Sequence, residues 1–254
     1  MATRTILETL RAVLVEFVGV PGSGKTTLAE ALAAEFQRRG LTVVQANNAW
    51  RHPWRWTTRI HRLRLAVECA VASPASARSA IRLVQASKQR SLSDAASVVT
   101  NWLCKLRLMR RRGAADIGVT DEGTLHAIWS LAYSATARDA IAALAAHHLV
   151  TLAPSAWIVV RVATEEQVAS RWLLSREGPR NRLAADITTA GSAAIRDAAA
   201  AGCVVDELVA SLAACGAIRA VLDVVNEPGT SPEETVWSLA ARVLSIRGQS
   251  VHGP

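Results

Sequence analysis

The chain has 254 residues, 50% of them hydrophobic, and carries a net charge of +8 from 29 Lys and Arg against 21 Asp and Glu. This length is enough for one α/β domain with a proper core. No linker or internal repeat divides the chain, so a single domain is expected over residues 1–254. The positive charge suits nucleic acid, an anionic surface or a phosphorylated substrate equally and selects none of them.

Residue spacing argues against a zinc protein and against a membrane protein. The cysteines lack CxxC or Cys/His ligand spacing, which predicts buried thiols in a reducing compartment. Glu8 and Glu16 interrupt the apolar N-terminal stretch, so no signal peptide is expected. The uncharged run 140–160 contains two histidines and a proline, which favours a helix end and a buried strand over a membrane span. We expect a soluble, cytoplasmic protein. The cysteines are Cys69, Cys104, Cys203 and Cys215.

The first predicted elements form a β-turn-α-β unit. A strand over residues 13–18 runs into a glycine-rich turn, and a helical pattern follows over 25–39 and ends at Gly40. Residues 41–46 read as a second short strand. Such a unit begins a parallel sheet.

The rest of the chain alternates between helical and strand patterns. Residues 50–112 are helical throughout, with breaks expected near Pro53, at Ser73-Pro74 and around 91–94, where Ser93 and Asp94 suit a helix start. Five strands with helical crossovers predict a three-layer, doubly wound parallel sheet with a helical insertion after the second strand. The later strands are expected over 117–120, 156–162 and 218–225, and the later helices over 125–148, from 164, over 184–214 and from 231.

The segment from Gly19 to Thr26 reads GVPGSGKT and matches GxxxxGK[ST]. Glycines let backbone N–H groups turn inward around a polyphosphate, and the following helix N-terminus favours an anion. Lys25 supplies a positive charge for the β- and γ-phosphates, and the Thr26 hydroxyl can ligate Mg²⁺. ATP with Mg²⁺ is therefore expected. The predicted nucleotide-binding residues are Gly19, Pro21, Gly22, Ser23, Gly24, Lys25, Thr26 and Thr27.

An acidic turn, Asp121-Glu122-Gly123, follows the expected strand at 117–120. Because the carboxyl ends of parallel strands meet at one edge of the sheet, this turn should lie near the phosphate loop. A carboxylate there can hold Mg²⁺ directly or through water, and Asp121 is assigned this role. Glu122 either contacts the substrate, assists as a base or belongs to a solvated turn.

Arginines cluster after the fourth expected strand. The guanidinium group of arginine can donate two hydrogen bonds to phosphate oxygens. Arginine therefore suits the binding of a phosphoryl group during its transfer. Arg171 and Arg176 are the predicted catalytic pair, on a lid over residues 171–184 hinged at Gly178-Pro179. An ordinary basic helix face is the alternative. Two further arginines, Arg180 and Arg182, complete the cluster.

Two other groups of residues are open to two interpretations each. Tryptophans and arginines between Trp50 and Arg64 either bind a base, a sugar or an anion, or pack Trp inward with Arg outward. His126, Trp129 and Tyr133 share one helical face beyond the acidic turn and either line an acceptor pocket or pack in the core. A second basic run, residues 105–112, is expected to be a solvated helix end.

The chain resembles the nucleoside and nucleotide kinases, the thymidylate-kinase-like group of P-loop proteins. The resemblance lies in the order of three features along the chain: the phosphate loop, the acidic turn and the R-x4-R segment. The resemblance implies a 2-3-1-4-5 sheet, Mg-ATP as donor and an arginine-bearing lid. Lys25 and Thr26 would carry the donor-phosphate and metal roles, with Asp121 at the acidic position after strand three. Two departures concern the acceptor: residues 45–48 lack the Glu usual after the second strand, and the helical insertion is long.

Two functions follow from these residues. The first is a small-molecule kinase that transfers the γ-phosphoryl group of Mg-ATP to an unidentified acceptor, such as a nucleoside or nucleotide. The second is a P-loop ATPase that acts as a regulatory or nucleic-acid-binding module. No NKxD-type segment favours GTP, and residues 226–230 are a weak candidate for adenine contact. The Ala and Leu face of residues 184–214 buries either the core or a homodimer interface.

Overall fold

A computed structural model describes residues 13–45, 55–110, 115–153, 156–165, 182–227 and 231–249. Parallel strands alternate with helices through these ranges, as the patterns predict. In chain order the elements are β1 (Val13–Val18), α2 (Lys25–Arg38), β2 (Val43–Gln45), α3 (Arg55–Ala72), α4 (Pro74–Ser87), α5 (Leu92–Arg110), β3 (Ile117–Thr120), α6 (Thr124–Ser134), α7 (Ile141–Val150), β4 (Ala156–Ala163), α9 (Arg182–Ala190), α10 (Ser192–Ala214), β5 (Ala220–Val225) and α11 (Pro232–Gln249).

The five strands form one parallel sheet in the order β2-β3-β1-β4-β5, which confirms the predicted fold class and strand order of a P-loop kinase. The central strand β1 starts level with both neighbours, since Val13 pairs with Ile117 of β3 and with Ala156 of β4. All strands therefore end at the same edge of the sheet. The turns after β1 and β3 are neighbours there.

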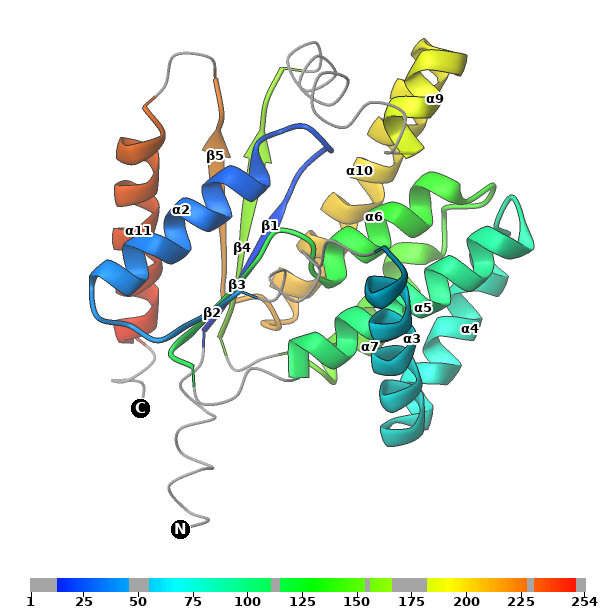
Figure 1. Cartoon of the computed structure of the whole chain (residues 1–254), viewed down its shortest axis with the longest axis horizontal. Coiled ribbons are helices and arrows are strands. Elements are labelled where there is room, and N and C mark those ends of the chain that lie inside the picture. The colour runs from blue at the N-terminus through cyan, green and yellow to red at the C-terminus, as the bar shows by residue number, and fades with distance from the viewer. Residues whose placement is uncertain are drawn as a thin grey trace.

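Helices cover both faces of the sheet (Figure 1), and one hydrophobic core lies on each face. Alternation along β1 divides its side chains between them, because Val15 and Phe17 pack with α2 and α11 while Leu14 and Val18 face the larger helical layer. That larger layer contains α6, α7 and α10 next to the sheet, with α3, α4 and α5 beyond them. Glu16 is also fully buried in β1, and its partners are described with the site below.

The helical insertion after the second strand is confirmed in the described part as α3, α4 and α5, which pack on one another. The break at Ser73-Pro74 is also confirmed, with the Ser73 hydroxyl accepting from the amide of Ser76 at the start of α4. The third break lies where expected, but the capping residue is Ser91, whose hydroxyl accepts from the amide of Asp94. Pro53 lies outside the described residues.

Two helices that the patterns predict as continuous are each divided. The prediction over 125–148 is wrong between Ser134 and Ile141, because Thr136 donates its amide hydrogen to the carbonyl groups of Ser87 and Lys88. Pairing with the α4–α5 loop thus replaces the next helical turn. The prediction over 184–214 is wrong at Gly191, where a positive φ of 53° separates α9 from α10.

The cysteines also depart from expectation. Cys69 and Cys104 are buried thiols, as predicted, and burial raises the pKa of both. Cys203 and Cys215 are exposed on the α10 helix and its C-terminal end, so the prediction of four buried thiols is wrong for them. In the described portion of the chain, no helix is both long and apolar enough to cross a membrane.

Candidate functional site

The phosphate loop connects β1 to α2 and turns through glycines with positive φ. Gly22 and Gly24 have φ values of 86° and 85°, a conformation that side-chain-bearing residues rarely adopt. The loop is held from the far edge of the sheet by Asn226, whose amide Nδ2 donates to the carbonyl oxygen of Ser23 at 2.8 Å. This contact places Asn226 against the loop backbone. It is a supporting role that the sequence pattern did not indicate.

Lys25 begins α2 and folds its side chain over the loop that precedes it. Its Nζ donates to the carbonyl oxygens of Gly19 at 2.8 Å and Val20 at 2.7 Å, and the side chain is only 7% exposed. Burial lowers the pKa of Lys25 to about 8, against the attraction of Asp121 and Glu122. The ammonium group therefore remains mainly charged at neutral pH and is positioned for an anion inside the loop.

Thr26 and Asp121 meet across the gap between the phosphate loop and the turn after β3. Thr26 Oγ1 donates a hydrogen bond to Asp121 Oδ2. Both residues line the same cavity, and Asp121 is 5% exposed. The structure thus brings together the two predicted metal-binding residues. Hydroxyl and carboxylate oxygens are the donors Mg²⁺ takes alongside substrate phosphates, so the pair fits this ion.

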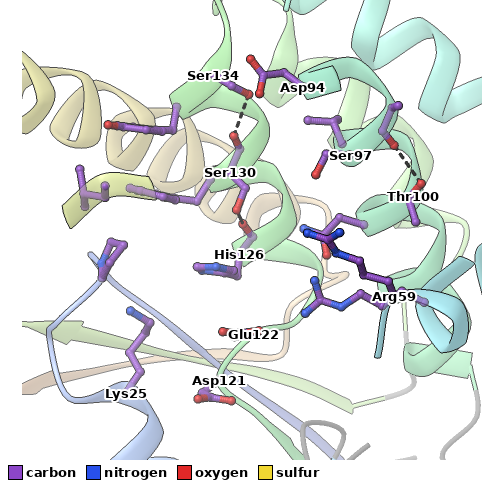
Figure 2. Close-up of a pocket in the computed structure, with 18 of the residues that line it drawn as sticks. Lys25, Arg59, Asp94, Ser97, Thr100, Asp121, Glu122, His126, Ser130 and Ser134 are labelled. Atoms are coloured by element: carbon purple, nitrogen blue, oxygen red, sulfur yellow. Dashed lines mark hydrogen bonds between the residues drawn. The ribbon is translucent and has the colours of Figure 1, made fainter. Parts of the chain in front are cut away.

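Glu122 is far more exposed than Asp121. Its side chain is 47% exposed, lines the cavity and lies between Asp121 and His126 in Figure 2. The ammonium group of Lys105 on α5, only 3% exposed, lies 3.6 Å from its carboxylate. Burial raises the pKa of Glu122, but the charge of His126, which it carries only in acid, and the charges of Lys105 and Arg62 together lower it below its ordinary value. Glu122 is thus held as a carboxylate that faces open space.

Lys105 corrects the expectation that residues 105–112 are a solvated helix end. Its side chain is buried, and burial lowers its pKa despite the attraction of Glu122. Farther along α5, Arg107 is partly exposed and Arg110 is exposed, so the prediction describes only the end of the helix. No periodicity in the sequence distinguishes Lys105 from these neighbours, because its partner comes from another element.

Glu16 is the second residue that the patterns missed. Its carboxylate accepts from the Leu125 amide at 2.6 Å and from the Thr124 hydroxyl at 3.1 Å, which caps the N-terminus of α6. A Cβ atom on Gly123 would lie 2.4 Å from this carboxylate, so any other residue there would have to displace it. The signal was available, since a lone acid in an otherwise apolar strand requires a buried partner. Through this cap β1 orients the acidic turn.

The aromatic row on α6 both lines the cavity and packs in the core. His126 stacks on Trp129 with ring centroids 5.9 Å apart, and Trp129 stacks on Tyr133 at 5.2 Å. Trp129 and Tyr133 are buried, yet all three residues line the cavity. Burial lowers the pKa of His126 to about 4, so the imidazole is neutral at physiological pH. The row is a rigid wall of the site.

A cavity of about 870 Å³ extends from the phosphate loop to the helical insertion. Its floor is the acidic turn, and its walls come from α3, α5 and α6 (Figure 2). Of the predicted nucleotide-binding residues, the cavity is lined by Pro21, Gly22, Lys25 and Thr26 but not by Gly19, Ser23, Gly24 or Thr27. The charged and polar lining side chains are Lys25, Thr26, Arg59, Arg62, Asp94, Ser97, Thr100, Asn101, Asp121, Glu122, His126, Ser130 and Ser134.

Several predicted residues lie outside the described ranges. These include both predicted catalytic arginines, Arg171 and Arg176, together with most of the proposed lid, and Arg182 begins α9. In the basic insertion, Trp50 and Trp54 are also outside, whereas Arg59 and Arg62 of α3 line the cavity. Arg64 instead contacts Glu68 at 3.0 Å. The alternative of outward arginines fits Arg64 and Arg59, which are exposed, whereas Arg62 is half-buried.

Among solved structures the chain is similar to a shikimate kinase from Acinetobacter baumannii in complex with shikimate, at 13% identity and a TM-score of 0.40 over 94% of this chain and 96% of that one. No protein-family model matches the chain, and no curated protein matches it. The thymidylate-kinase-like group receives no specific support from these comparisons. The chemistry of the site is therefore derived from the chain's own residues.

Proposed function

We propose that this protein is a Mg-ATP-dependent phosphotransferase that acts on the hydroxyl group of a small molecule. The observation that carries the proposal is the hydrogen bond between Thr26 and Asp121, which joins the phosphate loop to the acidic turn on the floor of a large polar cavity. Phosphoryl transfer requires positioned charges more than covalent chemistry by the protein. The phosphate loop, the acidic turn and the cavity would position these charges.

The donor phosphates would lie in the phosphate loop. There Lys25, which donates to the carbonyl oxygens of Gly19 and Val20, would offer its ammonium group to the β- and γ-phosphates. Thr26 and Asp121 would hold Mg²⁺, which neutralises phosphate charge when bound. Because the cap from Glu16 fixes the start of α6, the acidic turn keeps its place beside the loop.

Glu122 is the base in this proposal. Asp121 is engaged with Thr26, whereas Glu122 faces the cavity as a carboxylate. An acceptor hydroxyl beside Glu122 would transfer its proton to the carboxylate as its oxygen bonds to the γ-phosphorus. The bond between that phosphorus and the β–γ bridging oxygen breaks, and ADP leaves. Glu122 thus replaces the carboxylate missing after β2.

The experiment is a transfer assay with ATP labelled at the γ-phosphate, Mg²⁺, and a panel of nucleosides, nucleoside monophosphates, sugars and hydroxy acids. Label should appear in an acceptor, with ADP released in equal amount, and Lys25→Ala should abolish both. ATP hydrolysis that no acceptor changes would reject the kinase and indicate the ATPase alternative. Absence of ATP binding by the wild type would reject both functions.

A further inference from the structure

The outer face of α3 is apolar along most of the helix. Ile60, Leu63, Val67 and Val71 are 53–78% exposed, and we call these four residues the outer stripe. At 3.6 residues per turn they fall within about 80° of the helix circumference and extend over about 16 Å. Among the described helices, none of the others exposes more than one large apolar side chain. Single exposed apolar residues are ordinary, but a contiguous row marks an interaction surface.

The opposite face of α3 already holds the helix in the fold. Leu65, Ala66 and Cys69 are buried there, and α3 packs on α5 and α4. Ala66 and Cys69 belong to the larger hydrophobic core. The outer stripe is therefore not required to anchor α3. A helix that is apolar on two opposite faces is typical of a helix with packing partners on both sides.

The charges beside the outer stripe favour an uncharged, apolar partner. Arg64 lies at the edge of the stripe and contacts Glu68 at 3.0 Å, one turn farther along α3. Glu68 also contacts Arg107 of α5 at 3.4 Å. An acidic partner would be recognised by cations in the middle of its docking surface, whereas the middle of this face is aliphatic. The partner should therefore present a matching aliphatic surface.

The order of side chains along the outer stripe fits a second copy of α3 that runs antiparallel. Reversal about a point between Leu63 and Val67 places these two residues opposite each other and Ile60 opposite Val71. Each contact then joins a larger side chain to a smaller one, so the two helices can interdigitate. The spacing of three and four residues is that of paired helices. A parallel pair would instead place Ile60 against Ile60 and bring like ends of the helix dipoles together.

We propose that this protein forms a two-fold dimer in which the outer stripe of α3 packs against the outer stripe of a second copy. The stripe exposes on the order of 400 Å², about half of the roughly 800 Å² that each partner buries in a stable complex. The remainder would come from the flanks of α3 and from α4, where Ile81 is exposed. The apolar face of α10 packs in the larger core instead, through residues such as Ala201 and Leu208.

The dimer would lie beside the candidate site, because Leu63 belongs both to the outer stripe and to the lining of the cavity. Packing against a second copy would hold α3, which supplies one wall of that cavity, in a fixed position. The inference goes beyond the proposed function and does not depend on it, since the contact involves neither the phosphate loop nor the acidic turn.

Sedimentation equilibrium of the full chain, at about 1 to 100 µM, tests the dimer. We expect the wild type to sediment with twice the chain mass. Val67→Gln with Val71→Gln should raise the dissociation constant about 100-fold or more, because both copies lose two apolar contacts. Glutamine favours helix, so this variant should stay folded, which circular dichroism verifies. Trp237→Gln is the matched control, since it changes an exposed side chain of α11 on the other face of the sheet and should leave the dimer intact.

Crosslinking tests the direction of the two helices. Cys203→Ser with Cys215→Ser first removes the exposed thiols. In this background, a short bismaleimide should join Ile60→Cys copies to Val71→Cys copies when the two variants are mixed, and should join few copies of either variant alone. Efficient crosslinking of Ile60→Cys alone would show that the helices run parallel and would overturn the proposed arrangement.

Three other outcomes would overturn the dimer. The first is a wild type that stays monomeric over the whole concentration range. The second is a dimer whose dissociation constant is unchanged by Val67→Gln with Val71→Gln. The third is a monomer that binds phosphatidylserine vesicles, but not phosphatidylcholine vesicles, through Val67 and Val71. That result would assign the outer stripe to a membrane surface, for which α4 offers the exposed cations Arg78 and Arg82.

Discussion

Thr26 and Asp121 are 95 residues apart in the chain, and the Thr26 hydroxyl donates a hydrogen bond to the Asp121 carboxylate. The bond connects the first turn of α2 with the turn after β3, two segments that meet because β1 and β3 are parallel neighbours. It presents two oxygen atoms side by side at the open end of the phosphate loop. The proposed Mg²⁺ site depends on this pair.

Asp121→Asn should lower ATP turnover about 100-fold or more, because a neutral amide is a much weaker ligand for Mg²⁺ than a carboxylate. Its response to Mg²⁺ should also shift to much higher concentrations. Turnover measured across a Mg²⁺ titration checks both. Thr26→Ser keeps the hydroxyl and should stay close to wild type, whereas Thr26→Ala should not. Wild-type Mg²⁺ dependence in Asp121→Asn would remove Asp121 from the metal site.

The affinity for ATP should depend on the ionisation of Lys25. Burial holds its pKa at about 8, and a polyphosphate binds the charged form, so affinity is retained below pH 8 and lost above it. We expect affinity to fall about tenfold per pH unit above 8, as one linked proton requires. Titrations of a fluorescent ATP analogue between pH 7.5 and 9.5 measure this.

Lys25→Arg serves as the control for this pH dependence. Arginine remains charged throughout that window, so the variant should bind more weakly but with a flat pH profile. A wild type whose affinity is the same at both ends of the window would show that the Lys25 charge contributes little to nucleotide binding.

Gly123→Ala should destabilise the protein by about 2–4 kcal/mol, because the added methyl group collides with the buried Glu16 carboxylate and disturbs the cap of α6. Urea unfolding followed by circular dichroism measures the change. Gly202→Ala is the matched control, since nothing lies within 4 Å of its Cβ position in α10. That change should be neutral or stabilise by up to about 1 kcal/mol. Equal effects would contradict the Glu16 contact.

Lys105→Met should change the pH dependence of turnover. Lys105 contributes to the lowered pKa of Glu122, so its removal raises that pKa and the base loses its charge at a higher pH. The acidic limb of the profile should then shift to higher pH than in the wild type, while activity at alkaline pH stays similar. Lys105→Arg keeps a positive charge and should restore the wild-type profile. An unchanged profile in Lys105→Met would argue against Glu122 as the base.

The phosphate loop could be predicted from the sequence because its conformation is local. Eight consecutive residues from Gly19 to Thr26 carry the required glycines, lysine and hydroxyl, and the alternation of strand and helix patterns on both sides predicts a parallel sheet. Asp121 followed from the same reasoning, since the ends of parallel strands share one edge. These inferences need only the chain direction and the periodicity of each segment.

Tertiary structure alone decided which distant side chains meet. Periodicity indicates that Lys105 lies on a helix and Glu16 on a strand, but not that one contacts Glu122 and the other caps α6. Likewise Arg59 and Arg64 are alike in sequence, yet the first lines the cavity and the second contacts Glu68. The physical reason is that local pattern determines which face of an element is buried, whereas the partner of that face depends on how separate elements pack.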